Sequence, residues 1–315
     1  MAIALGAAMG APAFTGAEAT AAPVAFSRQQ VKVGRQAWPV MQLRADLEDP
    51  KTRLALRFAY DTGVPLKRRQ GFSGMAEGSQ AAALVNGTFF SIRTADTMGT
   101  LVSEGRVRQH RDWDDRGTAF KIGADGRAQI RTLRVEGRPD HRNSRFYLTS
   151  GPRLVREGKV WLQPKREGFQ DPALFGRHPR MALGLAEGGK TLIVACFPAR
   201  MTLSQTAQAM RTLGAHDALN LDGGPSVGMA YRGKIVASPH WGLTNALVLY
   251  DAKYPGPARR DDGLRQAAAV QAPVASVAAR EHEASAPLIS SAGPSRSRAP
   301  EACHGRLGRT ARSRS

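Results

Sequence analysis

Apolar and polar residues alternate along much of the chain in the two-residue period of β-strands. Residues 53–60 (RLALRFAY) nearly alternate, and residues 81–90 (AAALVNGTFF) end an apolar run in a polar turn. Residues 99–109, 119–130 and 152–162 each place two short β-runs around an acidic residue followed by glycine. Because glycine accepts the positive φ of a tight turn, each of these three segments predicts a hairpin.

One helix is predicted, over residues 202–213. Thr202 is a candidate N-cap, Gln205 completes a capping box, and Gly214 is a natural stop. The apolar run TLIVACF (191–197) precedes this helix, and DALNLD (217–222) follows it. Together they predict a β-α-β unit whose first strand is buried on both faces.

After this unit, residues 227–238 are predicted to form a hairpin that turns at Arg232 and Gly233, and residues 245–251 a last strand. The pattern as a whole predicts an α+β fold. It is a mixed, β-sheet-rich single domain with one β-α-β unit and several hairpins.

Composition divides the chain into three zones. Residues 1–24 are rich in Ala and Gly and are similar to a secretory signal without its basic start, which favours export to the periplasm or medium over a merely disordered leader. Residues 25–252 form the predicted globular body. Residues 253–315, rich in Pro, Ala, Ser and Arg, contain too few large apolar residues to fold and are predicted to be disordered.

The formal charge of +19 does not by itself indicate a nucleic-acid-binding protein. Residues 253–315 hold eleven Lys and Arg against five Asp and Glu, and the other basic residues are scattered without a recognition motif. Specific nucleic-acid binding is therefore not predicted. Affinity of the basic tail for polyanions remains an alternative role.

Cysteine and histidine patterns add little chemistry. Cys196 lies inside an apolar run and Cys303 in the polar tail, so no disulfide is predicted, and Cys196 is interpreted as a buried small hydrophobe. His110 stands near Asp112, Asp114 and Asp115 without the spacing of metal ligands, which favours a solvated loop. No cofactor is predicted, and a divalent-metal requirement stays open.

Residues 224–228 (GPSVG) match the G-x-S-x-G pattern of a serine nucleophile elbow. An elbow serine must open a helix and be followed by an acid and then a histidine, but here a hairpin follows and His240 precedes Asp251. Ser226 is therefore interpreted as a hydrogen-bonding residue. The glycines beside Asp222 could instead form an anion-binding nest with an adjacent carboxylate, or simply a tight turn.

Several segments in one order resemble the phosphodiester glycosidase (NAGPA) family, which includes the enzyme that uncovers mannose 6-phosphate. The segments are ALVNGTFF (83–90), MGTLVSEGRV (98–107), TSGPRLVREGKVW (149–161), PRMALGLAEGGKTLIVACF (179–197) and ALNLDGGPSVGMAYRGKIVASP (218–239). The likeness covers residues 50–250. Thr88, Met181 and Pro225 depart from the family pattern, and Pro225 removes one N–H donor from the glycine turn.

The resemblance implies a hydrolase that cleaves the phosphodiester of a sugar 1-phosphate in an exported glycan or glycoconjugate. Matched positions that it implies as site residues are Asn86, Arg180, Asn220, Asp222, Gly223, Gly224 and Ser226. Arg180 and the two glycines would hold phosphate, and Asp222 would activate water or stabilise an oxocarbenium-like sugar. Asn86 and Ser226 would orient substrate hydroxyls or that water.

Four further residues are weaker candidates. Glu104 is a candidate second catalytic carboxylate, with a turn position as the alternative. Gly87 and His240 are candidate substrate contacts, and either His178 or His240 could act as an acid or base. A non-catalytic module that binds a glycan or the cell envelope through the same cleft is the alternative function.

Overall fold

The structure is a computed structural model that describes residues 22–111 and 115–257. Within this part of the chain the β-rich α+β architecture predicted from the sequence is confirmed. Most of the predicted leader and tail, with Cys303, Asp112 and Asp114, lies outside the described residues.

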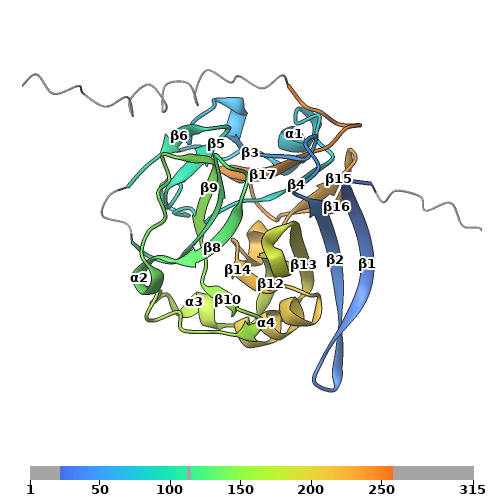
Figure 1. Ribbon diagram of the computed structural model, residues 1–315, viewed down its shortest axis with the longest axis vertical. Coiled ribbons are helices and arrows are strands. Elements are labelled where there is room, and N and C mark those ends of the chain that lie inside the picture. The colour runs from blue at the N-terminus through green and yellow to red at the C-terminus, as the bar shows by residue number, and fades with distance from the viewer. Residues whose placement is uncertain (1–21, 112–114, 258–315) are drawn as a thin grey trace, which may run out of the picture. The chain divides into compact units, whose positions relative to one another are not determined.

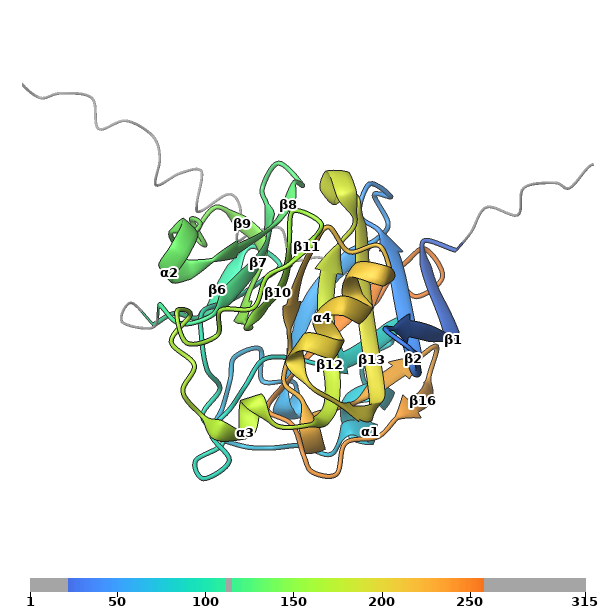
Figure 2. The same ribbon diagram turned by 90° about the horizontal axis from the view of Figure 1, so that it is seen from below.

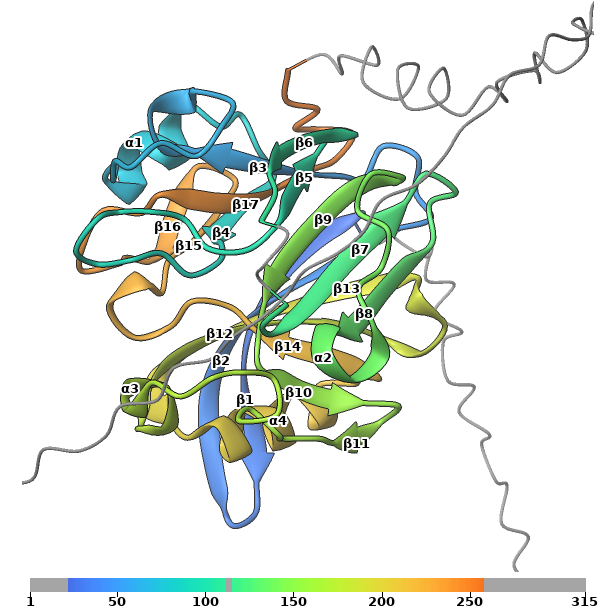
Figure 3. The same cartoon turned by 90° about the vertical axis from the view of Figure 1, so that its left-hand side faces the viewer.

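The described strands form three sheets in which every pair of neighbouring strands is antiparallel (Figure 3). The first sheet has seven strands, in the order β1 (Val24–Val33), β2 (Gln36–Asp46), β13 (Thr191–Met201), β12 (His178–Leu185), β14 (Asp217–Asn220), β10 (Arg153–Arg156) and β11 (Lys159–Val160). The second has five, in the order β16 (Lys234–Ala237), β15 (Met229–Tyr231), β4 (Ala83–Asn86), β17 (Asn245–Tyr250) and β3 (Arg53–Phe58). The third also has five, in the order β6 (Arg106–Gln109), β5 (Leu101–Ser103), β9 (Ser144–Ser150), β7 (Thr118–Gly123) and β8 (Ala128–Thr132).

Helices are short among the described residues. The α-helices are α1 (Phe72–Glu77), α2 (Leu133–Glu136), α3 (Pro172–Phe175) and α4 (Leu203–Thr212), and the 3₁₀ turns are η1 (Ala59–Asp61), η2 (Glu187–Gly189) and η3 (Gly224–Ser226). α4 begins as predicted, because the Thr202 side chain accepts from the Gln205 N–H while the Gln205 side chain accepts from the Thr202 N–H. It ends before Gly214, which has a φ of 90°.

The predicted hairpins are confirmed, and three of them use the same turn. β5–β6, β10–β11 and β15–β16 are each joined by two residues that both have positive φ, which matches the twist of the flanking strands. The pairs are Glu104 (54°) with Gly105 (77°), Glu157 (51°) with Gly158 (72°), and Arg232 (48°) with Gly233 (77°). The β1–β2 hairpin, which no sequence pattern predicted, is longer and lies along one side of the molecule (Figure 1).

The β-α-β unit is present with a strand inserted into it. β13 and β14 run parallel, since each pairs antiparallel with β12, which lies between them. α4 contacts β12 and β13 and crosses them in Figure 2. The chain therefore reaches the end of β14 directly beside β12.

β13 is buried on both faces, which explains its continuous apolar run. Ile193 and Phe197 belong to the cluster that includes α4, whereas Val194 and Cys196 belong to the cluster shared with the other two sheets. Burial raises the pKa of the Cys196 thiol to about 12. Cys196 is thus an inert core residue, as its sequence context predicted.

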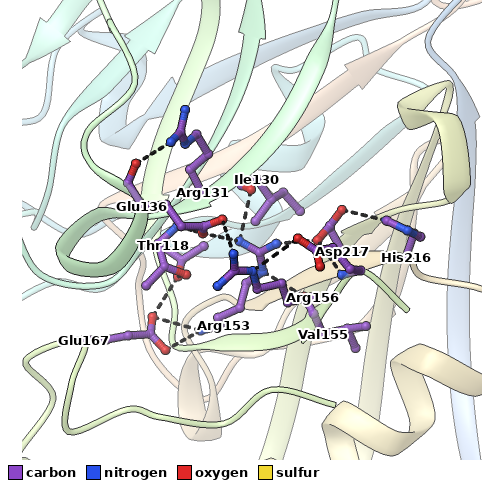
Figure 4. A network of polar contacts seen from close by, with 12 residues as sticks. Thr118, Ile130, Arg131, Glu136, Arg153, Val155, Arg156, Glu167, His216 and Asp217 are labelled. Atoms are coloured by element: carbon purple, nitrogen blue, oxygen red, sulfur yellow. Dashed lines mark hydrogen bonds and ion pairs between the residues drawn. The ribbon is translucent and has the colours of Figure 1, made fainter. Parts of the chain in front are cut away.

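A buried arginine ties the first sheet to the third (Figure 4). Arg153 of β10 is 2% exposed, and its guanidinium donates to Glu136 of α2, to Asp217 of β14 and to the Ile130 carbonyl of β8. The Arg153 N–H donates to the Glu167 carboxylate at 2.9 Å. This network fixes β10, β14 and β8 against one another.

Candidate active site

A cleft of about 470 Å³ lies among the connecting segments of the sheets. Most of its lining comes from the loop after β4 (residues 88–90, 92 and 98–99), the end of β9 (149–150), the segment around α3 that leads into β12, and the turn after β14, and Arg116 and Trp241 complete it. Figure 3 shows the loop after β4 and α3 on the same side of the molecule. The cleft is therefore lined mainly by segments that connect the strands and not by the middle of any sheet.

Five of the seven family-matched candidates line this cleft together: Arg180, Asn220, Asp222, Gly223 and Gly224. Arg180 comes from β12, and Asn220 is the last residue of the adjacent strand β14. The insertion of β12 between β13 and β14 therefore brings the arginine beside the Asp-Gly-Gly turn.

Asp222 is the central carboxylate of the cleft. Its Oδ1 accepts a hydrogen bond of 2.9 Å from the Gly223 N–H. Burial raises the pKa of the Asp222 carboxyl to about 7, although the hydrogen bonds from Ser226 and from the Gly223 N–H oppose this rise. Asp222 thus changes its charge close to neutral pH, as acid–base catalysis at neutral pH requires.

Ser226 lies behind Asp222 and is completely buried. Its Oγ accepts 2.8 Å from the indole N–H of Trp241, which can only donate, so the serine hydroxyl proton is left to bind the Asp222 carboxylate. The residues after Ser226 form β15 and β16. This geometry gives Ser226 a fixed partner and agrees with its interpretation as a hydrogen-bonding residue.

Asn86 and Gly87, at the end of β4, hold the turn from the other side. The Asn86 side chain donates to the Asp222 carbonyl at 2.8 Å and accepts from the Gly228 N–H at 3.1 Å, so it clasps both ends of the turn. The Asp222 N–H donates to the Gly87 carbonyl at 3.2 Å. Asn86 and Gly87 contact the turn and are not among the residues that line the cleft.

Arg180 is a buried cation without a carboxylate partner among the described residues. Its guanidinium is held by the carbonyls of Met201 (3.2 Å), Leu174 (3.0 Å) and Gly176 (2.6 Å). Burial lowers the pKa of Arg180 to about 10, so it stays charged at neutral pH. A buried, uncompensated guanidinium facing a cleft is suited to an anion.

The glycines of the turn leave room beside this arginine. A Cβ on Gly223 would lie 3.2 Å from the Pro179 carbonyl, and Gly224 has a φ of 58°. A side chain at either position would crowd or strain the turn, so glycine is required at both positions next to Arg180.

Of the weaker candidates, Glu104 and His240 lie outside the cleft and His178 lines it. Glu104 occupies the β5–β6 turn and forms an ion pair with Arg53, and it is not among the residues that line the cleft. His240 is exposed, and its N–H donates to the Pro225 carbonyl at 2.8 Å. His178 does line the cleft, as does Asp171, whose side chain caps α3.

Thr149, Ser150 and Asn220 line the cleft, and each has a buried side-chain oxygen without a hydrogen-bond partner among the described residues, which sequence reasoning did not predict. Ser150 is 3% exposed and Asn220 is completely buried, and both line the cleft. Their Oγ and Oδ1 atoms have no hydrogen-bond partner among the described residues. Ser150 carried no sequence signal beyond its place in the segment 149–161.

Trp241, Asn245 and Thr88 also shape the site. Asn245 accepts from the Thr88 N–H at 2.9 Å, and the Thr88 hydroxyl donates to the Thr149 carbonyl at 2.6 Å. Thr88, where the family pattern has glycine, thus joins the loop after β4 to β9. These long-range contacts leave no mark in the local sequence.

Groups of three or more metal-binding side chains are absent from residues 22–111 and 115–257. None of the helices described for the chain is long and apolar enough to cross a bilayer. A carboxyl group with a pKa of about 7, a buried arginine and a glycine turn in one cleft are suited to acid–base chemistry on an anionic ligand.

Comparison with known proteins identifies the family of this chain. The family model described as phosphodiester glycosidase (NAGPA) matches residues 79–250, which is more than half of the chain. The chain therefore belongs to the phosphodiester glycosidase family of hydrolases. No curated protein matches it in sequence.

Solved structures share the fold at low identity. A hypothetical protein from Synechocystis is 16% identical with a TM-score of 0.59, and the match covers 73% of this chain and 62% of that one. The catalytic domain of zebrafish N-acetylglucosamine-1-phosphodiester α-N-acetylglucosaminidase, auto-inhibited by its pro-peptide, is also 16% identical with a TM-score of 0.59. That match covers 75% of this chain and 85% of the zebrafish domain.

Proposed function

We propose that the protein hydrolyses the phosphodiester of a sugar 1-phosphate in an exported glycan or glycoconjugate, and that residues 25–252 are its catalytic domain. The observation that carries this proposal is that Asp222 and Arg180 line the same cleft. Asp222 has its pKa raised to about 7 by burial, and Arg180 is buried without a carboxylate partner among the described residues.

The proposed reaction breaks the bond between the anomeric carbon and the phosphate oxygen. Ionised Asp222 removes a proton from water as the water oxygen bonds to the anomeric carbon, or stabilises the positive charge that develops on the sugar. The electron pair of the broken bond goes to the departing phosphate monoester. Phosphate is a better leaving group than an alcohol, so stabilising its charge matters more than protonating it.

Arg180 and the Gly223–Gly224 turn supply that charge stabilisation. Donors that are already fixed do not have to reorganise as negative charge develops. The Arg180 guanidinium is held by three carbonyls, and the turn is held by Asn86, so both are pre-organised.

The test is to incubate the full chain with 4-nitrophenyl diesters of several hexose 1-phosphates in water enriched in oxygen-18. We expect free sugar carrying the label and unlabelled 4-nitrophenyl phosphate. Release of sugar 1-phosphate would show cleavage at phosphorus and contradict the mechanism. Asp222→Asn should abolish turnover with an unchanged circular dichroism spectrum, whereas a non-catalytic binding module would show no turnover in the wild type.

A further inference from the structure

Three cleft-lining residues, Thr149, Ser150 and Asn220, each have a buried side-chain oxygen without a hydrogen-bond partner among the described residues, and two of them are joined through the backbone. Asn220 ends β14 and Ser150 ends β9, and the Gly151 N–H next to Ser150 donates to the Asn220 carbonyl at 2.8 Å. The two residues are therefore fixed side by side through the backbone. Ser150 Oγ and Asn220 Oδ1 have no partner among the described residues.

An unsatisfied buried polar group destabilises a fold by roughly 1–3 kcal/mol, so native proteins seldom keep one without a use. Here both atoms belong to residues that line the cleft. A ligand that enters the cleft and bonds to them would recover that free energy. Two such atoms on cleft-lining residues that the Gly151–Asn220 hydrogen bond joins indicate a ligand-binding position.

The Asn220 amide has a defined orientation. Its Nδ2 donates to the Leu221 carbonyl, which can only accept, so the amide oxygen is the atom without a partner. This oxygen binds only a donor, such as a hydroxyl or an N–H group. An ionised phosphate offers no donor and would be repelled by it.

We propose that Ser150 and Asn220 form a subsite for one hydroxyl or N–H group of the glycosyl unit and thereby set the direction in which the substrate lies. The proposal rests on the proposed function and extends it to substrate orientation. The sugar lies over Asn220 and Ser150, its anomeric carbon lies at Asp222, and its phosphate lies at Arg180 and the glycine turn. Ser150 is then a specificity-determining residue.

Ser150→Ala tests this assignment because it removes a hydroxyl without creating an unsatisfied group. We expect kcat/KM on the preferred hexose 1-phosphodiester to fall by roughly 10- to 100-fold. The melting temperature of the free protein should stay the same or rise, because an unsatisfied polar atom has been removed. A merely structural serine would show the opposite behaviour.

Ser103→Ala is the matched control. Ser103 is also a buried strand serine, but its hydroxyl accepts from the Leu56 N–H at 2.9 Å, and it does not line the cleft. We expect this variant to lose a few degrees of melting temperature, roughly 2–4 °C per kcal/mol, and to keep kcat/KM within about twofold.

Substrates that each lack one ring hydroxyl identify the group that is bound. One deoxy substrate should lose activity on the wild type and lose nothing further on Ser150→Ala. Unchanged kcat/KM in Ser150→Ala, or a fall in its melting temperature like that of Ser103→Ala, would overturn the subsite.

Binding separates this proposal from the proposed function. If no diester is hydrolysed, titration calorimetry with the same hexoses and hexose 1-phosphates still tests the subsite. Tenfold weaker binding to Ser150→Ala would support the subsite while the hydrolase assignment fails. No measurable binding of any of these sugars to the wild type would overturn the subsite.

Discussion

Burial raises the pKa of Asp222, and hydrogen bonds from Ser226 and the Gly223 N–H lower it. The net result is a pKa of about 7. Because the proposed mechanism needs the carboxylate, kcat/KM should rise between about pH 5 and pH 8 with a midpoint near 7, as the raised pKa of Asp222 requires. A steady-state pH profile measures this midpoint. Activity that falls through pH 7 would instead assign Asp222 as a proton donor.

Ser226→Ala supplies an internal check on that assignment. The Ser226 hydroxyl stabilises the charged carboxylate and so lowers the pKa of Asp222. Removing the hydroxyl should move the midpoint of the profile upward by about 1 pH unit. A midpoint that does not move would show that another group controls the profile.

The same burial makes Asp222 a source of instability at alkaline pH. An unfolded aspartate has a pKa near 4, whereas the folded pKa is about 7. The folded state holds the proton more tightly, so stability falls as pH rises from about 4 to 7. Three pKa units at about 1.4 kcal/mol each mean that Asp222→Asn should raise the free energy of unfolding by up to about 4 kcal/mol at pH 8 and by little at pH 4.

Urea denaturation of both proteins at both pH values measures this difference. Glu167, whose pKa burial also raises to about 7, adds the same trend to both proteins and cancels in the comparison. Asp125→Asn is the control, because Asp125 is 61% exposed on the β7–β8 turn and should show no such gap. Equal stability of wild type and Asp222→Asn at pH 8 would contradict the burial argument.

The elements that the sequence predicted are those specified by local signals. The capping box of α4 and the turns with glycine in second place need only neighbouring residues, and each forms as expected. β1 and β2 were missed, in part because Pro39 interrupts the pattern of β2. Pro39 is tolerated because that stretch pairs with β1 alone, β13 joining β2 only from Met41 onward.

The candidate site was also predictable only in part, because local sequence signals mark some of its residues and long-range contacts position the others. Asp222 stood out because two glycines follow it, but its support comes from Asn86, 136 residues earlier. Its partner Ser226 is in turn oriented by Trp241. The position of β12 between β13 and β14, which brings Arg180 to the turn, is a property of sheet order that no local pattern encodes.

Gly87 shows how a strand end controls the site. A Cβ at Gly87 would lie 1.9 Å from Asn245 Oδ1, and the Gly87 carbonyl accepts from the Asp222 N–H. Gly87→Ala should push β4 away from β17, lowering the free energy of unfolding by about 2 kcal/mol or more and displacing Asp222. Activity and melting temperature should fall together.

Gly71→Ala is the comparison for that variant. A Cβ at Gly71 meets nothing within 4 Å, and the residue has a φ of −60°, so alanine fits there. Because Gly71 is the N-cap of α1, where alanine is less favourable than glycine, we expect a change in the free energy of unfolding of at most about 1 kcal/mol. If both alanine variants behave alike, close packing at Gly87 is not what positions the turn.

At the scale of the whole molecule, Arg153 joins sheets that the chain visits far apart in sequence. Its guanidinium bridges Glu136 and Asp217, and its N–H binds Glu167, which also accepts 2.7 Å from the Thr118 hydroxyl of β7 (Figure 4). Glu167 precedes the cleft-lining residues Gly168 and Phe169. The network that holds the sheets together therefore also supports one wall of the cleft.

Arg153→Met tests whether this network stabilises the fold. The variant keeps the apolar volume but removes the buried cation that joins Glu136 to Asp217, leaving Glu136 with Arg156 and Asp217 with His216. Removal of one partner from a buried ion pair destabilises by about 3–5 kcal/mol. Arg134→Met is the matched control, because Arg134 is 40% exposed and pairs with the exposed Asp115 at 2.8 Å. An exposed pair contributes at most about 1 kcal/mol. Urea denaturation should thus separate the two variants by at least 2 kcal/mol, and equal losses would assign the cohesion of the sheets to their apolar core alone.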